Sequence, residues 1–402
     1  MTFYTLPHVS CKINPENLKI KFCDNNTIFI NKTASLYLNQ IKRKIDKHNE
    51  SWDNVKKYTN PYEYIHTSCP NSNHSVSKLK PLSRAFFKFI EMANIFDIFE
   101  EYHSKTINTF HLAEGPGGFI EAIQLLRMNR ADKYYGMTLI DNNNDHVPGW
   151  KKAQTFLDKH PNIIIEKGSD GTGDIYHPDN FKYCREKYGN SMEIITGDGG
   201  FDFSIDFNKQ EEMAFRLIFS QVAYAIAMQK KGGTFILKFF DSFMKCSVDI
   251  LFLLSSFYHN VHVIKPQTSR YANSEKYVVC TNFKYSDTSA ISNKLYNIIS
   301  VLNNMTMKSI SISTILNVTI NDRFLGHLKN INAILGNQQM ENISTTLRFI
   351  ENKETKGERL EQLSKKNIEK CVSWCVKNKI PFHNVVHSQN IFLKPYSKKY
   401  TN

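Results

Sequence analysis

The stretch Thr109-Phe110-His111-Leu112-Ala113-Glu114-Gly115-Pro116-Gly117-Gly118-Phe119 decides the fold of this 402-residue chain. Its first half is a short apolar run typical of a buried strand, and its glycines open directly onto a helical pattern over residues 118–128. Glycines at such a turn let a ligand approach the backbone, because no side chain blocks it. The spacing is not Gly-x-Gly-x-x-Gly and no Gly-Lys-Ser/Thr follows, so NAD and ATP fit poorly. A turn that needs glycines only for its conformation is the alternative.

Short strand-like runs alternate with helical runs around this turn, over about residues 80–285. The alternation is typical of a parallel sheet covered by helices on both faces, so we expect an α/β fold. The expected strands are 109–113, 133–139, 162–166, 193–196, 234–239, 260–264 and 276–281, and the expected helices between them are 118–128, 210–229 and 246–257.

The segments on either side of this region differ from it in composition and in hydrophobic pattern. Residues 1–79 are rich in Asn and Lys, with a helical stretch over 34–58 and a loop of Ser, Asn and Pro from residue 66 onward. Ser83 is a plausible N-cap for a helix over 83–92. We therefore expect an N-terminal helical and loop extension (1–79), a central domain (80–285) and a C-terminal helical extension (286–402). The last has helical spacing over 290–303, 323–335 and 356–378, and a basic tail over 394–399.

Composition limits the class of protein. Hydrophobic residues make up 41% of the chain, a level that suits a globular core, and 51 Lys+Arg against 38 Asp+Glu give a formal charge of +13. This excess favours a polyanionic partner, because Lys and Arg displace counterions from phosphate. Eight scattered cysteines without a Cys-x-x-Cys pair indicate neither a zinc site nor a disulfide framework. We expect no bound metal.

The sequence also gives expectations about the cellular location of the protein. The longest apolar run, residues 250–258, is too short to span a membrane, and the N-terminus lacks the pattern of a secretory signal. We therefore expect an intracellular protein with no membrane partner, in the cytoplasm, with the nucleus left open.

Charged residues stand beside apolar strands at several places. Asp198 and Lys238 close two expected strands, and Glu275 heads another. Because the carboxyl ends of parallel strands converge on one crevice, Asp198 and Lys238 could share a site with the glycine turn. A lysine between two carboxylates can take or steer the proton of a weakly acidic hydroxyl, and Lys88 could stabilise the oxyanion that forms. A purely structural ion-pair network is the alternative.

Another acid follows the third expected strand. Asp174, at the carboxyl edge of the sheet, can accept a hydrogen bond from an adenine amino group. Asp141, after the second strand, could instead contact a ribose. An exposed loop acid without a ligand is the alternative for Asp174.

A collinear set of motifs resembles the FtsJ-type ribose 2′-O-methyltransferases, above all the mRNA cap-1 enzymes of eukaryotes and of large DNA viruses. The motifs are residues 83–88, 114–119, 173–175, 198–201, 232–238 and 268–279. The resemblance implies a Rossmann-like methyltransferase sheet with helices on both faces and S-adenosyl-L-methionine as the cofactor.

The resemblance also implies roles for individual residues. A catalytic Lys-Asp-Lys-Glu tetrad would match Lys88, Asp198, Lys238 and Glu275, with Lys238 as the proton acceptor for the ribose 2′-hydroxyl. Relatives usually have an acid where this chain has His111, and a small residue where it has Glu114. Contacts carried over to the cofactor fall on Ser83, Gly115, Pro116, Gly117, Gly118, Phe119, Asp174, Ile175 and Asp198. Contacts carried over to the substrate fall on Asn208, Gln210 and Asn273.

The implied function is methylation of the first transcribed nucleotide of capped mRNA, which is cap-1 formation, with capped mRNA and other capping enzymes as expected partners. Two alternatives stay open: 2′-O-methylation of ribosomal or transfer RNA, and a non-catalytic RNA-binding capping subunit. The abundance of Asn, Lys and Ile fits an AT-rich genome. Together with the resemblance it favours a large DNA virus as the source, and hence the host cytoplasm or the virion as the location.

Overall fold

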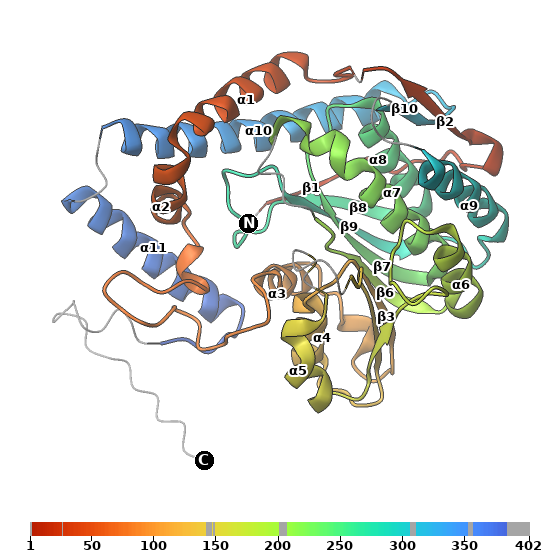
Figure 1. The fold of residues 1–402 in the computed structure, drawn as a ribbon, viewed down its shortest axis with the longest axis horizontal. Helices are drawn as coiled ribbons and strands as arrows, with labels where there is room; N and C mark the ends of the chain where they lie inside the picture. The colour runs from red at the N-terminus through yellow and green to blue at the C-terminus, as the bar shows by residue number, and fades with distance from the viewer. Residues whose placement is uncertain are drawn as a thin grey trace.

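The computed structural model describes residues 2–25, 27–141, 147, 149–200, 207–305, 311–352 and 357–383, so the expected basic tail lies outside the described residues. An eight-stranded sheet forms the centre, in the order β1-β8-β9-β7-β6-β3-β4-β5 (Figure 1). The strands are β1 (Phe3–Thr5), β3 (Asn108–Leu112), β4 (Lys133–Met137), β5 (Ile163–Glu166), β6 (Met192–Gly197), β7 (Gln229–Phe239), β8 (Tyr258–Ile264) and β9 (Lys276–Phe283).

This sheet confirms the expected α/β fold. All seven expected strands are present, with boundaries shifted by a few residues, and β3 to β7 run parallel to one another. β9 is antiparallel to both β7 and β8. The sequence did not predict β1, which adds an antiparallel edge to β8, because three residues are too few to display a period.

Alternate residues of the central strands enter two separate cores. Ile195 packs on one face of the sheet and its neighbour Ile194 on the other, and Leu237 and Ile236 divide in the same way. Successive side chains of a strand point to opposite faces, so a continuous apolar run must be covered on both sides. The helices that cover the first face are α6 (Pro178–Tyr188), α7 (Gln210–Met228), α8 (Lys245–Phe257) and α9 (Ser289–Asn304); those on the second are α3 (Ala85–Ile95), α4 (Gly118–Arg127) and α5 (Gln154–Lys159).

The flanking segments pack on each other. The expected helix over 34–58 is divided into α1 (Lys32–Ile45) and α2 (Asn49–Thr59), and α10 (Asp322–Glu351) is far longer than expected. α1 and α10 lie side by side along the top of Figure 1, and β2 (Leu18–Cys23) pairs with β10 (Ser311–Leu316). α11 (Glu358–Lys377) follows. The short 3-10 helices are η1 (Pro15–Asn17), η2 (Asp46–His48), η3 (Glu63–Ile65), η4 (Glu100–Tyr102), η5 (Lys151–Ala153) and η6 (Phe207–Lys209).

Direct hydrogen bonds join the two flanks. The hydroxyls of Thr59 and Thr346 are 2.7 Å apart, and the side-chain amides of Asn342 and Asn367 donate to the carbonyls of Thr59 and Tyr58. The strand pairs β1–β8 and β2–β10 cross the limits of the expected segments 1–79, 80–285 and 286–402. The division into three domains therefore stays a prediction. Within the described residues, no helix combines the length and the apolar character needed to cross a membrane.

A buried ion pair fastens the N-terminal flank to the loop between β8 and β9. Glu63 in η3 is fully buried and accepts hydrogen bonds from Arg270 Nε at 3.0 Å and Nη2 at 2.5 Å. Burial alone would raise the pKa of Glu63, but the hydrogen bonds and charge of Arg270 outweigh it and lower the pKa to about 2 from its usual 4.5. The pair therefore stabilises the fold at neutral pH.

Replacing Glu63 with Gln is expected to lower the free energy of unfolding at pH 7 by about 3 kcal/mol, because it removes a carboxylate whose folded pKa lies below its unfolded pKa. The stabilisation is complete above the unfolded pKa and is lost as the pH falls from about 4.5 towards 2. Urea unfolding of wild type and Glu63→Gln between pH 7 and pH 2 measures the difference in the free energy of unfolding. Stabilities of wild type and Glu63→Gln that differ by a constant amount from pH 7 to pH 2 would contradict the prediction.

Candidate active site

The carboxyl ends of the parallel strands open into a cavity of about 690 Å³. The order of the strands reverses between β3 and β6, since the chain adds β4 and β5 on one side of β3 and returns to place β6 on the other. Crevices at such reversals are the usual ligand sites of open α/β sheets. The residues that line the cavity include Ser83, Arg84, Lys88, Gly115, Pro116, Leu139, Asp174, Ile175, Asp198, Leu217 and Lys238.

Glycines let the turns around the cavity approach one another. A Cβ on Gly118 would lie 2.2 Å from Ser83 Oγ and 3.2 Å from the backbone nitrogen of Phe86, so only glycine allows α4 to start against α3. Gly173 has φ of +66°, and a Cβ there would lie 2.2 Å from the carbonyl oxygen of Thr138. The glycine turn, the start of α3 and the loop before α6 therefore close around one space.

The expected cofactor residues fall into two groups. Ser83, Gly115, Pro116, Asp174, Ile175 and Asp198 line the cavity, whereas Gly117, Gly118 and Phe119 are not among its lining residues. Phe119 is fully buried, and its ring packs 5.1 Å from that of Phe89. Direct cofactor contact by these three stays a prediction. Asp141 also lies outside the lining, and Phe201 lies outside the described residues.

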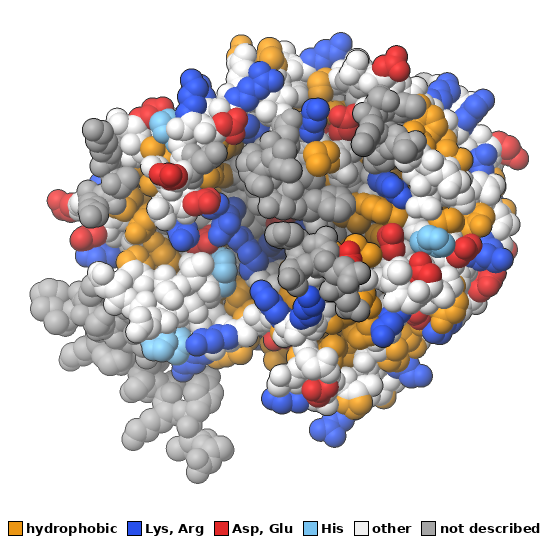
Figure 2. Space-filling view, viewed as in Figure 1, with side chains coloured by type: hydrophobic (Ala, Val, Ile, Leu, Met, Phe, Trp, Pro, Cys, Tyr) orange, Lys and Arg blue, Asp and Glu red, His pale blue; other side chains and the backbone are white. Residues whose placement is uncertain are grey.

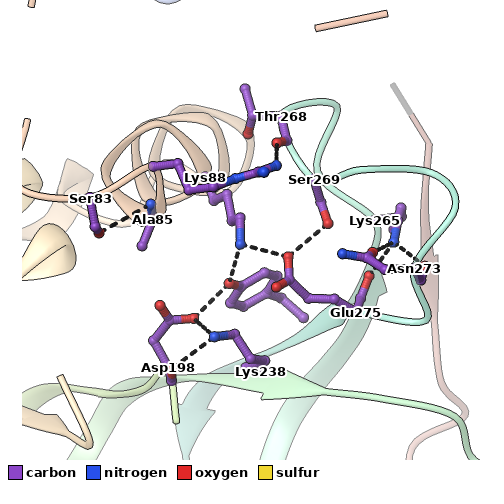
Figure 3. A network of polar contacts seen from close by, with 12 residues as sticks. Ser83, Ala85, Lys88, Asp198, Lys238, Lys265, Thr268, Ser269, Asn273 and Glu275 are labelled. Atoms are coloured by element: carbon purple, nitrogen blue, oxygen red, sulfur yellow. Dashed lines mark hydrogen bonds and ion pairs between the residues drawn. The ribbon is translucent and has the colours of Figure 1, made fainter. Parts of the chain in front are cut away.

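The four residues of the expected tetrad form two ion pairs (Figure 3), and three of them, Lys88, Asp198 and Lys238, line the cavity. Lys88 Nζ on α3 lies 2.6 Å from Glu275 Oε1, and Lys238 Nζ on β7 lies 2.9 Å from Asp198 Oδ1. Lys238 Nζ also donates to the Asp198 carbonyl at 2.8 Å. The structure thus brings together side chains that are far apart in the sequence.

Two hydroxyl groups that the sequence analysis did not single out complete this network. The Tyr277 hydroxyl donates to Asp198 Oδ1 at 2.6 Å and accepts from Lys88 Nζ at 3.4 Å, so it bridges the two ion pairs. Ser269 Oγ donates to Glu275 Oε1 at 2.7 Å. A signal existed for Tyr277, because its position two residues after Glu275 on a strand predicts the same face.

Burial and the two carboxylates set the charge states. Burial lowers the pKa of Lys88, although Glu275 opposes it. Burial also acts to lower the pKa of Lys238, but the charges of Asp198 and Glu275 outweigh it, and the pKa is raised. For Glu275, the neighbouring lysines Lys88 and Lys238 overcome the effect of burial and hold the pKa below its usual value. Lys238 is therefore a cation in this state.

His111 and Glu114, the two departures from the usual motif, have structural partners. Both ring nitrogens of His111 contact threonine hydroxyls, Thr109 at 2.7 Å and Thr196 at 2.8 Å, and burial lowers its pKa to about 3. Glu114 Oε1 accepts the N–H groups of Phe119 and Ile120, which caps the start of α4. His111 is thus a neutral core residue and Glu114 a helix cap.

None of the three expected substrate residues is in the lining of the cavity. Asn273 in the loop between β8 and β9 accepts from Lys265 Nζ at 2.6 Å. Gln210, the first residue of α7, accepts a hydrogen bond from Ser274, the neighbour of Asn273. Asn208 lies in η6. Figure 2 shows Lys and Arg side chains gathered around a hollow near the middle of this face.

The donors and walls of the cavity suit a nucleoside that carries an amino-acid chain. Asp174 offers a carboxylate for an amino group, and Leu139, Ile175 and Leu217 supply apolar surface. Ser83 and the turn at Gly115 offer polar groups elsewhere in the lining. A parallel sheet with this cavity at its strand reversal and with paired lysines in the cavity lining is the arrangement of an S-adenosylmethionine-dependent methyltransferase.

The chain belongs to the FtsJ-like methyltransferase family, whose model matches residues 81–283. This match confirms the family expected from the motifs, and membership of a methyltransferase family supports S-adenosyl-L-methionine as the cofactor.

Several curated relatives carry related names. The cap-specific mRNA (nucleoside-2′-O-)-methyltransferase 2 of Drosophila melanogaster is 27% identical over 61% of this chain and 36% of its own length. The cap-specific mRNA (nucleoside-2′-O-)-methyltransferase 1 of Danio rerio is 28% identical over 70% of this chain and 33% of its own length. The cap-specific mRNA (nucleoside-2′-O-)-methyltransferase 1 of Trypanosoma cruzi is 36% identical over 42% of this chain and 46% of its own length. The chain thus spans between a third and a half of the length of these relatives.

Among solved structures, a putative ribosomal RNA methyltransferase from Plasmodium falciparum aligns with 50% of this chain and 97% of its own. The identity is 20% and the TM-score is 0.35, from which we draw no conclusion.

Tyr277→Phe is expected to lower the free energy of unfolding by about 1–2 kcal/mol, because Asp198 and Lys88 each lose one of their hydrogen-bonding partners and the link between the two ion pairs is removed. Tyr135→Phe is the matched control, since the Tyr135 hydroxyl makes no hydrogen bond to any described residue, and it should change stability by less than about 0.5 kcal/mol. Urea unfolding measures both variants. Equal stabilities of the two would show that the Tyr277 bridge contributes nothing.

Proposed function

We propose that this chain is a cap-specific mRNA nucleoside 2′-O-methyltransferase, which transfers a methyl group from S-adenosylmethionine to the ribose 2′-hydroxyl of the first transcribed nucleotide. The observation that carries the proposal is the pair of lysine–carboxylate contacts, Lys88 with Glu275 and Lys238 with Asp198, whose lysines both line the cavity. The names of the relatives support the cap as the recognised feature.

In this proposal the cavity residues hold the cofactor. S-adenosylmethionine, when bound, supplies an electrophilic methyl group on a positively charged sulfur. Asp174 accepts the adenine amino group, Ile175 packs against the ring, and Ser83 receives the amino-acid end together with the turn at Gly115 and Pro116. Gly117, Gly118 and Phe119 belong to the proposed site because they set the shape of this turn.

The tetrad orients the 2′-hydroxyl and stabilises the charge that forms on its oxygen. Lys238 would first release a proton to solvent and then take the proton of the 2′-hydroxyl as the hydroxyl oxygen gains the methyl group, and Asp198 fixes the direction of the Lys238 side chain. Lys88, held by Glu275, supplies a second positive charge beside the oxygen. Alignment and charge placement supply most of the catalysis in such a site.

The expected substrate residues are the proposed contacts to RNA. Asn273 and Gln210 are linked through Ser274, so the start of α7 and the loop before Glu275 would move as one unit when a nucleotide binds. Asn208 lies just before α7 and joins the same surface. Capped mRNA is the proposed partner, other capping enzymes are candidate partners, and an intracellular location in the cytoplasm or nucleus stays a prediction.

Purified protein is expected to methylate capped RNA and to leave uncapped RNA of the same sequence largely unmethylated. Lys238→Ala should lower the rate by about 100-fold or more, because it removes the group that takes the proton. Lys230→Ala is the control, since Lys230 pairs with Glu193 near the start of β7. Transfer of labelled methyl groups from S-adenosylmethionine measures the rate of wild type and of each variant on capped and on uncapped RNA.

Three outcomes would count against parts of this proposal. Equal methylation of capped and uncapped RNA would favour a ribosomal or transfer RNA substrate. Full activity of Lys238→Ala would remove Lys238 from the mechanism. Binding of RNA without methyl transfer would favour a non-catalytic capping subunit, although that alternative gives no physical reason for two buried lysine–carboxylate pairs.

Asp174→Ala is expected to weaken binding of S-adenosylhomocysteine by about tenfold or more, because the adenine amino group loses its hydrogen-bond acceptor. Asp179→Ala, an exposed acid on α6, is the control and should bind like wild type. Isothermal titration calorimetry measures the dissociation constants without any turnover. Unchanged affinity in Asp174→Ala would contradict the proposed role of Asp174.

A further inference from the structure

One face of α11 carries three lysines that line a groove outside the active site. Lys366, Lys370 and Lys377 are spaced so that their side chains lie along the same side of the helix. They border a groove of about 420 Å³ together with Tyr62, Gln267 and the acid Glu369. α11 lies at the left of Figure 1, on the side of the fold opposite to α6 and α9.

The groove carries excess positive charge. Within the described part of the chain, none of the three lysines has a carboxylate within ion-pair distance, and Glu369 is the one acid in the lining. The Lys88 and Lys238 ammonium groups, by contrast, are buried against carboxylates. Unpaired lysines in a groove favour a polyanion, because binding releases the counterions condensed on its phosphates.

Direct contacts link the groove to the active site. Gln267 belongs to the loop that ends at Glu275, and its side-chain amide donates to the Tyr62 hydroxyl at 2.7 Å. The backbone N–H groups of Gln267 and Thr268 both donate to the buried carboxylate of Glu91, one turn after Lys88 on α3.

The neighbouring residue contacts the wall of the cavity. The carbonyl of Thr268 accepts from Arg84 Nη2 at 3.0 Å, and Arg84 lines the cavity. Adjacent residues of one loop thus border the groove and contact the wall of the active site.

We propose that this groove binds the phosphodiester backbone of the RNA on the 3′ side of the methylated nucleotide. The proposal rests on the proposed function, since that function puts a ribose in the cavity. On the 5′ side of a first transcribed nucleotide there is only the cap and its triphosphate, so the 3′ side alone offers a long row of phosphates. The groove then adds affinity for the body of the RNA without taking part in the chemistry.

The test is a triple variant, Lys366→Gln with Lys370→Gln and Lys377→Gln, compared with wild type on two substrates. One is a capped dinucleotide and the other a capped RNA of a few tens of nucleotides. At low salt the variant should bind the longer RNA about tenfold more weakly, and the slope of log K against log salt concentration should become shallower by about 2, since about 0.7 is lost for each phosphate contact to a single strand. Methylation of the capped dinucleotide should be unchanged.

The matched control removes the same charge elsewhere. Lys32→Gln, Lys329→Gln and Lys365→Gln change exposed lysines that do not line the groove, and Lys365 is on the same helix. This control should keep the affinity of wild type for the longer RNA to within about twofold. Thermal unfolding of both triple variants checks that the fold is intact.

Fluorescence anisotropy with labelled RNA and no cofactor measures binding separately from methyl transfer, so failure of the proposed function and failure of this proposal are distinguishable. Equal loss of binding on the dinucleotide and the longer RNA would assign the groove to the cap end and overturn the 3′ assignment. Unchanged binding of the longer RNA by the groove variant would overturn the proposal altogether. Polyglutamate is a polyanion without phosphates, so a variant that loses binding to polyglutamate but keeps its binding to RNA would overturn it as well.

Discussion

The burial of two lysine side chains is the constraint on which the site depends. Lys88 is buried and the side chain of Lys238 keeps only about an eighth of its surface exposed, and an ammonium group so far removed from water is tolerated only when a carboxylate pairs with it. The sheet register positions one of the two pairs: Asp198 directly follows Gly197, which pairs with Leu237, and Lys238 lies opposite Tyr277 across β7 and β9. A slip of one residue in either pairing would send Lys238 to the other face. Backbone pairing therefore fixes Lys238 and Asp198, whereas Lys88 is placed by α3 and Glu275 by the loop before β9.

The sequence predicted the central strands and the helices between them because each strand is a continuous apolar run with clear turn residues at its ends. It did not predict β1, which has three residues, nor β2 and β10, whose residues follow no regular alternation of exposed and buried positions. It also joined α1 and α2 into one helix, since the apolar spacing continues across η2. The strand ends predicted that Asp198 and Lys238 share a site with the glycine turn. The pairing of Lys88 with Glu275, the bridge by Tyr277 and the hydrogen bond from Ser269 depend on tertiary contacts that the strand ends do not specify.

The two unusual residues of the glycine turn illustrate the same limit. A charged residue next to a cofactor loop suggests a ligand contact, yet Glu114 uses one carboxylate oxygen on the backbone of α4. Burial raises its pKa to about 8, so at neutral pH it is largely protonated and adds little negative charge beside Asp198. His111 similarly serves the packing between β3 and β6. The sequence showed only that these two residues depart from the usual motif, whereas their contacts indicate helix capping and core packing.

The loop between β8 and β9 receives support from both ends of the chain. Glu63 holds Arg270, Tyr62 accepts from Gln267, and Gln339 on α10 donates to the Ala272 carbonyl at 2.9 Å. All of these supports lie outside residues 81–283, the part that the family shares. The part of the chain that matches the family model is therefore smaller than the part that supports this loop. A fragment cut to residues 81–283 would retain every motif but lose the three side chains that fix the loop leading to Glu275.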